Sequence, residues 1–176
     1  QDAAGNRQLV LAEIGGEPIL ERALHALASL GITEAVVVIG YMGAMVRGRI
    51  GSRFDGIDIF YVEAPDYATT NNIRSLWDAR DYLDQDLVLL EADVAFDAAV
   101  VGTLLAQNGS SAAVVPFEPT LSGTVVRRNS AGQATSFVLG AEQGPQFGTK
   151  DTFKTVNIYV LREQLLREQF LPRLSN

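Results

Sequence analysis

The alternation of short β-branched runs with amphipathic helical segments constrains the fold of this chain more than any other feature. Glu34–Gly40 (EAVVVIG) is a continuous apolar run, which is typical of a strand buried on both faces. Pro18–Leu30 spaces its apolar residues as an amphipathic helix does, and Gly31 is a typical helix C-cap. This alternation predicts an α/β protein with an open, mostly parallel sheet and helices on both faces.

The same patterns continue along the chain. Further strands are expected at residues 57–62, 86–92, 111–117 and 153–161. Further helices are expected at 42–54, from 71 or 72 to 83, at 97–107 and from about 162. Residues 123–128 and 134–139 indicate a hairpin around 129–132, and hence an antiparallel addition to the sheet. No internal repeat or linker interrupts the pattern, so a single domain over residues 1–176 is expected.

Composition excludes several classes of function. The chain has 14 Lys and Arg against 21 Asp and Glu, a net charge of −7, which argues against binding to nucleic acid or to an anionic membrane surface. It has no Cys, which excludes disulfides, thiolate metal sites and Cys nucleophiles. No apolar run is long enough to span a bilayer and no signal peptide opens the chain, so we expect a cytoplasmic protein.

Two carboxylates follow the strand expected at 86–92, in the octet LVLLEADV. Ligands of open α/β sheets bind beyond the carboxyl ends of the strands. On an extended chain, the spacing of two would put Glu91 and Asp93 on one side, where two oxygen ligands would suit Mg²⁺. Ordinary acidic residues at a strand end are the alternative, and the octet alone leaves both open.

A polar loop, residues 67–72, leads into the helix that follows it. The free amides of a helix N-terminus can receive an anion, and adjacent Asn71 and Asn72 offer both donors and acceptors to a pyrimidine edge. A plain N-cap is the alternative. Tyr67, in the same loop, is a candidate for stacking on a base or on a choline-like head group.

Lys154 lies within the apolar strand FKTVNIYVL. It is either a phosphate-binding cation or a lysine on a solvent-facing or edge side of the strand. Asn157 is three residues further on, so a bulge would be needed to bring both side chains into one site. His25 is isolated on the first helix and is expected to be structural.

Taken in order, these segments resemble the nucleotide-diphospho-sugar transferase-like nucleotidyltransferases, in particular the bacterial phosphocholine and 2-aminoethylphosphonate-type cytidylyltransferases. The resembling stretches are Leu11–Ile32, Val36–Tyr41, Tyr67–Leu83, Leu87–Asp97 and Phe153–Leu161. The resemblance implies the Rossmann-like nucleotide-diphospho-sugar transferase fold. It also implies a Mg²⁺-dependent enzyme that transfers CMP from CTP to a small phosphate or phosphonate by in-line displacement, with release of pyrophosphate.

The resemblance further implies roles for individual residues. Asp93 would bind Mg²⁺ and, with Lys154, carry the catalysis. The residues assigned to nucleotide binding are Asn71, Asn72, Ser75 and Glu91. Those assigned to the acceptor are Asn157 and Tyr67.

The chain departs from the family pattern at both ends. The first strand with its Gly-rich loop, and a Pro-Lys pair before Leu11, have no match, and a second metal-binding Asp would lie past Asn176. The domain is therefore expected to lack that first strand and the C-terminal end. Three alternatives stay open: a hexose-1-phosphate nucleotidyltransferase of the same fold, a glycosyltransferase, or a non-catalytic nucleotide-binding domain. A homodimer and a fusion to another biosynthetic domain are both compatible with the sequence.

Overall fold

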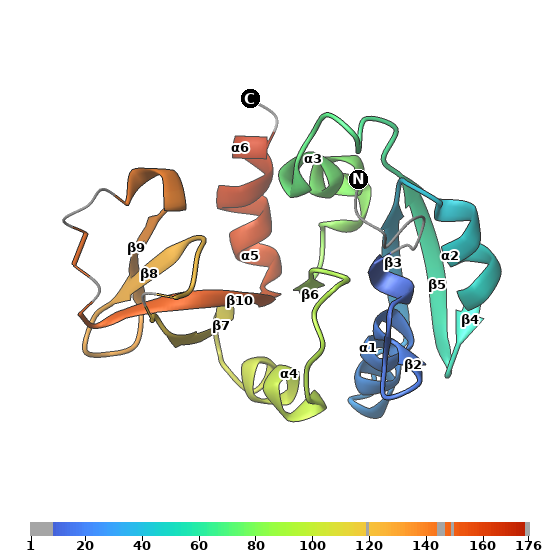
Figure 1. Ribbon diagram of the computed structural model, residues 1–176, viewed down its shortest axis with the longest axis horizontal. Coiled ribbons are helices and arrows are strands. Elements are labelled where there is room, and N and C mark those ends of the chain that lie inside the picture. Colours follow the sequence, from blue (N-terminus) through green and yellow to red (C-terminus); the bar gives the residue numbers. More distant parts are fainter. Residues whose placement is uncertain (1–8, 119, 144–146, 149, 175–176) are drawn as a thin grey trace.

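The computed structural model describes residues 9–118, 120–143, 147–148 and 150–174 (Figure 1). The strands are β1 (Glu13–Ile14), β2 (Glu17–Pro18), β3 (Glu34–Ile39), β4 (Arg53–Phe54), β5 (Ile57–Glu63), β6 (Leu87–Leu90), β7 (Ser111–Pro116), β8 (Val125–Arg128), β9 (Ala134–Val138) and β10 (Thr152–Leu161). The helices are α1 (Ile19–Ser29), α2 (Gly43–Ile50), α3 (Asn72–Asp78), α4 (Ala98–Leu105), α5 (Glu163–Leu165) and α6 (Leu171–Leu174). Three short 3₁₀ turns lie at Leu9–Leu11, Arg80–Tyr82 and Gly140–Glu142, and a π-helical turn over Leu166–Phe170 joins α5 to α6.

The expected α/β fold is confirmed, but the hydrogen-bonded pairing differs from a mostly parallel sheet. Among the described strands, β3 and β5 form the one parallel pair, and β4 lies antiparallel to β5. The long strand β10 pairs antiparallel with β6, β7 and β8, and β9 completes the hairpin with β8. Both β6 and β7 therefore run in one direction, as expected for strands joined through α4, but β10 lies between them and makes their pairing antiparallel.

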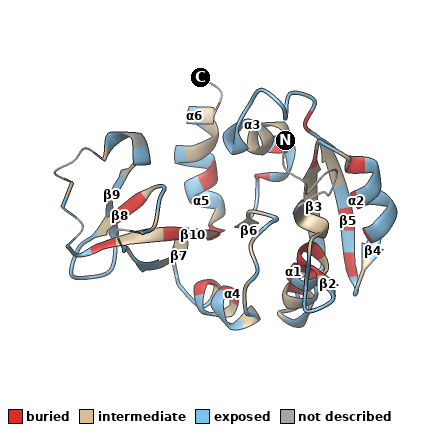
Figure 2. Cartoon of the chain, in the orientation of Figure 1, coloured by how far each residue is buried: buried red, intermediate tan, exposed pale blue. Residues whose placement is uncertain are grey.

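One hydrophobic core joins the two larger sheets (Figure 2). Leu20, Leu24 and Leu27 line the inner face of α1, at the helical spacing that the sequence predicted. They belong to the same cluster as Ile59 of β5 and Ile158 of β10, both at most 5% exposed. This packing therefore fixes the positions of β5 and β10, and of the ends of both strands, relative to each other.

Two expected helices are shorter than predicted. The segment expected to be helical over 42–54 forms α2, but the helix stops at Gly51, whose φ of 76° is left-handed, and the chain turns into β4. The segment expected to be helical to residue 83 ends as α3 at Asp78 and continues as a 3₁₀ turn. Among the described helices none is long and apolar enough to cross a membrane.

Candidate active site

The side chain of Glu91 joins three segments of the chain just beyond β6. Its Oε1 accepts a hydrogen bond from Nδ2 of Asn72 at 2.7 Å, and its Oε2 accepts one from Nδ2 of Asn157 at 2.6 Å. The backbone N–H of Glu91 also donates to the carbonyl oxygen of Asn157, at 3.2 Å. Asn72 begins α3 and Asn157 lies within β10. The structure thus brings together three of the residues singled out in the sequence, 19 and 66 residues apart along the chain.

A bulge in β10 turns Asn157 toward this network. The register of β10 against β7 shifts between Thr155 and Tyr159, and Asn157 has a φ of 60°, in the left-handed region. Asn is one of the few residues besides Gly that adopts this conformation readily. A bulge is therefore present at Asn157, as would be needed for Lys154 and Asn157 to share one site, and no described contact joins their two side chains. The hydroxyl groups of Thr155 and Tyr159 lie 3.3 and 3.5 Å from the Oδ1 of Asn157, so this side chain is held from both sides.

Lys154 is central in the sheet rather than at its edge. It lies opposite Val115 of β7 and Val125 of β8, and it is half-buried. Its Nζ donates to the carbonyl oxygen of Thr155 at 3.3 Å. A Cβ atom built on Gly123, in the loop before β8, would lie only 2.9 Å from this Nζ, so a side chain there would have to displace the ammonium group.

Asp93 and Glu91 do not share one side of a strand, and the prediction based on an extended chain is wrong. Strand β6 ends at Leu90, and the next residues form a turn in which the N–H of Val94 donates to the carbonyl oxygen of Glu91 at 3.2 Å. The alternation of side chains therefore stops at Glu91. Asp93 is exposed and has no hydrogen-bond or ion-pair partner within the described part of the chain.

The carboxylates present fit a Mg²⁺ ion that is shared with substrate phosphates. Within the described ranges no three His, Asp or Glu residues are grouped closely enough to hold a metal by themselves. Mg²⁺ usually needs fewer, since one or two carboxylates bind it together with water and phosphate oxygens. Asp93 supplies a carboxylate without a described partner. Each oxygen of Glu91 accepts one hydrogen bond from an asparagine amide and has a lone pair left for a further contact.

Three further residues from the sequence analysis take different positions. Oδ1 of Asn71 accepts from the backbone N–H of Ile73 at 3.1 Å, so this side chain caps α3. Ser75 is half-buried inside α3, and no described hydrogen bond links its hydroxyl to Glu91. Tyr67 packs on Gly40 at the end of β3, with its ring centroid 6.4 Å from that of Tyr41. The structure does not join Ser75 or Tyr67 to the Glu91 network through any described contact.

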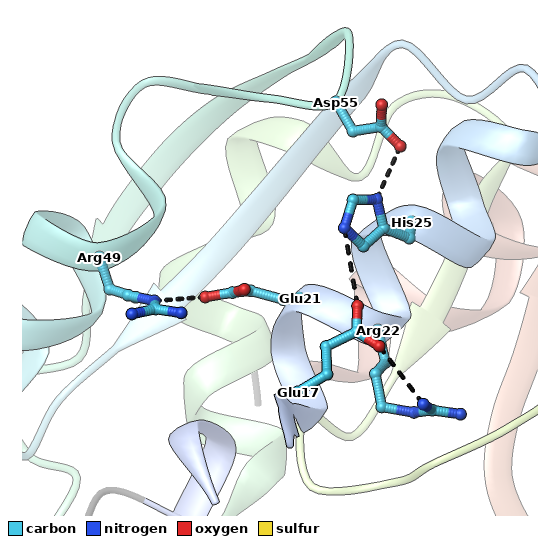
Figure 3. Close-up of polar contacts among 6 residues, drawn as sticks. All are labelled: Glu17, Glu21, Arg22, His25, Arg49 and Asp55. Atoms are coloured by element: carbon cyan, nitrogen blue, oxygen red, sulfur yellow. Dashed lines mark hydrogen bonds and ion pairs between the residues drawn. The ribbon is translucent and has the colours of Figure 1, made fainter. Parts of the chain in front are cut away.

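His25 is a structural residue, as its isolation on the helix suggested. Figure 3 shows its ring between Asp55 and Glu17, with Nδ1 2.8 Å from Oδ2 of Asp55 and Nε2 3.6 Å from Oε1 of Glu17. The ring also packs against Phe54, at 5.0 Å between centroids. These contacts tie α1 to β2 and to the turn before β5.

A match over most of the chain shows to which protein family it belongs. Residues 6–145 match the MobA-like NTP transferase domain. The chain belongs to this family. A CMP-5'-(3-aminopropyl)phosphonate synthase from Streptomyces rubellomurinus is 42% identical to this NTP transferase domain over 176 residues, which are 99% of the chain and 28% of the relative. A 2-aminoethylphosphonate cytidylyltransferase from Lancefieldella rimae is 31% identical over 85 residues, which are 48% of the chain and 33% of the relative.

A solved structure supports the fold. The inositol-1-phosphate CTP transferase of T. maritima matches this NTP transferase domain with a TM-score of 0.69 and 15% identity, over 95% of the chain and 66% of that structure. The fold is therefore that of the nucleotide-diphospho-sugar nucleotidyltransferases, as the sequence indicated. The chain spans about a third or less of the length of the two curated relatives.

Residues that sequence reasoning missed also contribute to the site of this NTP transferase domain. The hydroxyls of Thr155 and Tyr159 orient Asn157, and Gly123 leaves room for Lys154. Thr155, Asn157 and Tyr159 occur at alternate positions of one strand, which is a signal for the first pair, although the bulge at Asn157 interrupts the regular alternation. No comparable signal points to Gly123, because its approach to Lys154 depends on tertiary packing.

Proposed function

We propose that residues 1–176 form a single catalytic nucleotidyltransferase domain, a cytidylyltransferase that transfers CMP from CTP to a small phosphate or phosphonate and releases pyrophosphate. The observation that carries the proposal is the cluster around Glu91, which holds Asn72 and Asn157 together beside the exposed Asp93. Membership in an NTP transferase family supports the reaction class. The names of the aminopropylphosphonate and aminoethylphosphonate relatives support CTP and a phosphonate acceptor.

The proposed reaction is a single in-line displacement. An anionic oxygen of the acceptor attacks the α-phosphorus of CTP, and a new P–O–P linkage forms. The bond from the α-phosphorus to the bridging oxygen of the β-phosphate breaks, and pyrophosphate leaves with that electron pair. Because the attacking oxygen is already ionised, no side chain has to remove a proton. Catalysis then depends on positioning and on charge neutralisation.

Lys154 and Asp93 carry the charge chemistry in this proposal. The ammonium group of Lys154, held by the carbonyl oxygen of Thr155, offsets negative charge on the α-phosphate or on the attacking acceptor. Asp93 would hold Mg²⁺ together with oxygens of the substrate phosphates, while both oxygens of Glu91 accept hydrogen bonds from the asparagine amides. Bound there, the ion would neutralise phosphate charge and orient the triphosphate.

The remaining predicted residues divide between two substrates. We assign Asn71, Asn72, Ser75 and Glu91 to the nucleotide side, and Asn157 and Tyr67 to the acceptor side. Asn72 and Asn157 both bind Glu91, so the proposed nucleotide and acceptor sides meet at this carboxylate. A cytoplasmic location, and assembly as a homodimer or as part of a fusion with another biosynthetic domain, also belong to the proposal.

The test is pyrophosphate release by the protein that contains this domain, with CTP, Mg²⁺ and a panel of small phosphates and phosphonates. Asp93→Asn should lower kcat by at least about 100-fold, a typical effect of removing one charge-stabilising group. Asp81→Asn, the same change at an exposed residue in a 3₁₀ turn, is the matched control and should leave kcat unchanged.

Each unfavourable outcome points to a different interpretation. Near wild-type turnover by Asp93→Asn would remove this residue from the metal site. A preference for UTP or dTTP with a hexose 1-phosphate would replace the cytidylyltransferase by a sugar nucleotidyltransferase. CTP binding without pyrophosphate release from any acceptor would favour a non-catalytic nucleotide-binding domain.

A further inference from the structure

The two oxygens of Glu91 are both used by amide groups of the protein. Oε1 accepts from Asn72 and Oε2 accepts from Asn157, at 2.7 and 2.6 Å. Hydrogen bonds to an ionised carboxylate are short and about twice as strong as those between neutral groups. The bond to Asn157 is partly buried, which protects it from competition by water, whereas the bond to Asn72 is exposed. A residue that only contacted substrate would not need two protein partners.

The two partners of Glu91, Asn72 and Asn157, belong to α3 and β10. No other described hydrogen bond of this network connects these two elements. Asn72 is the first residue of α3, a helix of seven residues in which no residue is fully buried. Asn157 lies at the bulge of β10, where the left-handed φ interrupts the regular strand. Asn72 is exposed and lies in a helix without a buried residue, so its bond to Glu91 contributes strongly to its placement. The backbone of Asn157 is held between the buried Thr155 and Ile158, so its bond to Glu91 mainly fixes the direction of the side-chain amide.

We propose that Glu91 is a positioning residue that sets the distance between the nucleotide side and the acceptor side of the site. This inference rests on the proposed function, because it assigns those sides to α3 and to β10. Glu91 acts through Asn72 and Asn157, and its carboxylate is needed as an acceptor of two hydrogen bonds. The proposal predicts that the bonding pattern at position 91 matters, and that the location of the negative charge matters less.

A charge-swapped pair tests this directly. In Glu91→Gln, an NH₂ group replaces one carboxylate oxygen, so residue 91 can no longer accept hydrogen bonds from both asparagine amides. In Asn157→Asp, the carboxylates of residues 91 and 157 face each other and repel, whereas in the wild type the Asn157 amide donates to the Glu91 carboxylate. Each single variant should lower kcat/KM by about 10- to 100-fold, the range expected when a hydrogen bond to a charged group is lost.

The double variant E91Q/N157D restores every bond with the charge moved to the other residue. The new amide at position 91 would donate to the new carboxylate at position 157, and the amide oxygen would still accept from Asn72. Asp also tolerates the left-handed conformation and can still accept from the hydroxyls of Thr155 and Tyr159. We expect kcat/KM of the double variant to recover to within about fivefold of wild type, a strongly non-additive result for neighbouring residues.

Two results would overturn the proposal. Full activity of E91Q would show that the two-bond acceptor is unnecessary. A double variant as inactive as the worse single variant would show that the Glu91 carboxylate is required in place, as a metal ligand or substrate contact would be. Glu17→Gln is the matched control, since it makes the same change in a surface cluster with Arg22 and His25 (Figure 3), and its kcat/KM should equal that of wild type.

A readout independent of activity separates this proposal from the proposed function. The wild type, the two single variants and the double variant are compared in thermal unfolding, where the double variant should recover most of the Tm lost in each single variant. Recovery of Tm without pyrophosphate release by the wild type would support the positioning role and contradict the cytidylyltransferase. Pyrophosphate release by the wild type, with no recovery of either Tm or kcat/KM in the double variant, would support the cytidylyltransferase and contradict the positioning role of Glu91.

Discussion

At the scale of single residues, two carboxylates two positions apart have different surroundings. Glu91 is half-buried and bonded to two amides, whereas Asp93 is exposed in the turn that follows. The difference arises because β6 ends between Leu90 and Glu91, so the chain no longer alternates its side chains. Residue type and spacing therefore pointed to the turn after β6 as a candidate site, but they did not predict the different surroundings of its two carboxylates.

Gly123 offers a prediction about Lys154. In Gly123→Ala the new Cβ would lie 2.9 Å from Nζ and must displace the ammonium group. We expect kcat/KM to fall by about 10-fold or more, since a misplaced charged group loses over ~1 kcal/mol of stabilisation. The measurement is steady-state kinetics of pyrophosphate release.

The control for Gly123→Ala separates contact from backbone strain. Gly132, in the β8–β9 turn, also has a positive φ, of 81° against 107° for Gly123, but a Cβ there meets nothing within 4 Å. Gly132→Ala should therefore lose stability and keep the kcat/KM of the folded protein. Equal kcat/KM for the two variants would contradict the role given to Gly123.

At the scale of elements, α3 depends on its N-terminus. The helix has seven residues and none of them is buried, and the Asn71 side chain accepts from the N–H of Ile73. Asn71→Ala should destabilise the protein by about 1 kcal/mol, because one N–H loses its cap. For a domain of this size that corresponds to a fall in Tm of about 2–4 °C.

Thermal unfolding checks the cap. Asn108→Ala is the matched control, since Asn108 is exposed in the segment between α4 and β7 and caps no described helix. An Asn71→Ala variant with the Tm of the control would mean that α3 is held by its tertiary contacts alone, and the cap would have no measurable effect.

Element types were largely predictable from the sequence, but strand pairing was not. The β-branched run at β3 and the apolar stripe of α1 predicted those elements with nearly correct bounds. The long strand β10 was also expected, but its place between β6 and β7 was not, because a strand pattern carries no information about its neighbours. The bulge at Asn157 was inferred as a requirement, while its left-handed φ emerged only in the folded chain.

At the scale of the whole molecule, Asp86 and Arg162 connect distant elements. Nη1 of Arg162 donates to Oδ2 of Asp86 at 3.0 Å, and the N–H of Glu163 donates to its Oδ1 at 2.8 Å. Nη2 of Arg162 donates to the carbonyl oxygen of Leu105 at 3.0 Å, at the end of α4. The start of β6, the end of α4 and the start of α5 are thus held by one ion pair.

This ion pair gives a pH prediction. The hydrogen bond from the Glu163 backbone, and then Arg162, lower the pKa of Asp86. A depressed folded-state pKa adds stability above the unfolded-state value of about 3.9, and this contribution is lost as the pH falls through the folded-state pKa. Asp86→Asn should therefore cost at most about 1 kcal/mol at pH 7, since the side chain of Asp86 is 55% exposed, and progressively less below about pH 4.

Urea unfolding of Asp86→Asn and wild type, at pH 7 and again near pH 3, measures this difference. Asp84→Asn, a change of the same kind at an exposed neighbour, is the control and should show no gap at either pH. A stability gap for Asp86→Asn that grew toward low pH would contradict the assigned sign.

The central claim concerns CMP transfer, and ³¹P NMR of the reaction products tests it most directly. The protein that contains this domain is incubated with CTP, Mg²⁺ and a small aminoalkylphosphonate. We predict pyrophosphate together with two mutually coupled resonances, one from the phosphonate and one from the α-phosphate, because the product contains a P–O–P linkage. Unchanged CTP, or cleavage of CTP with an unmodified phosphonate, across the whole panel of acceptors would contradict CMP transfer.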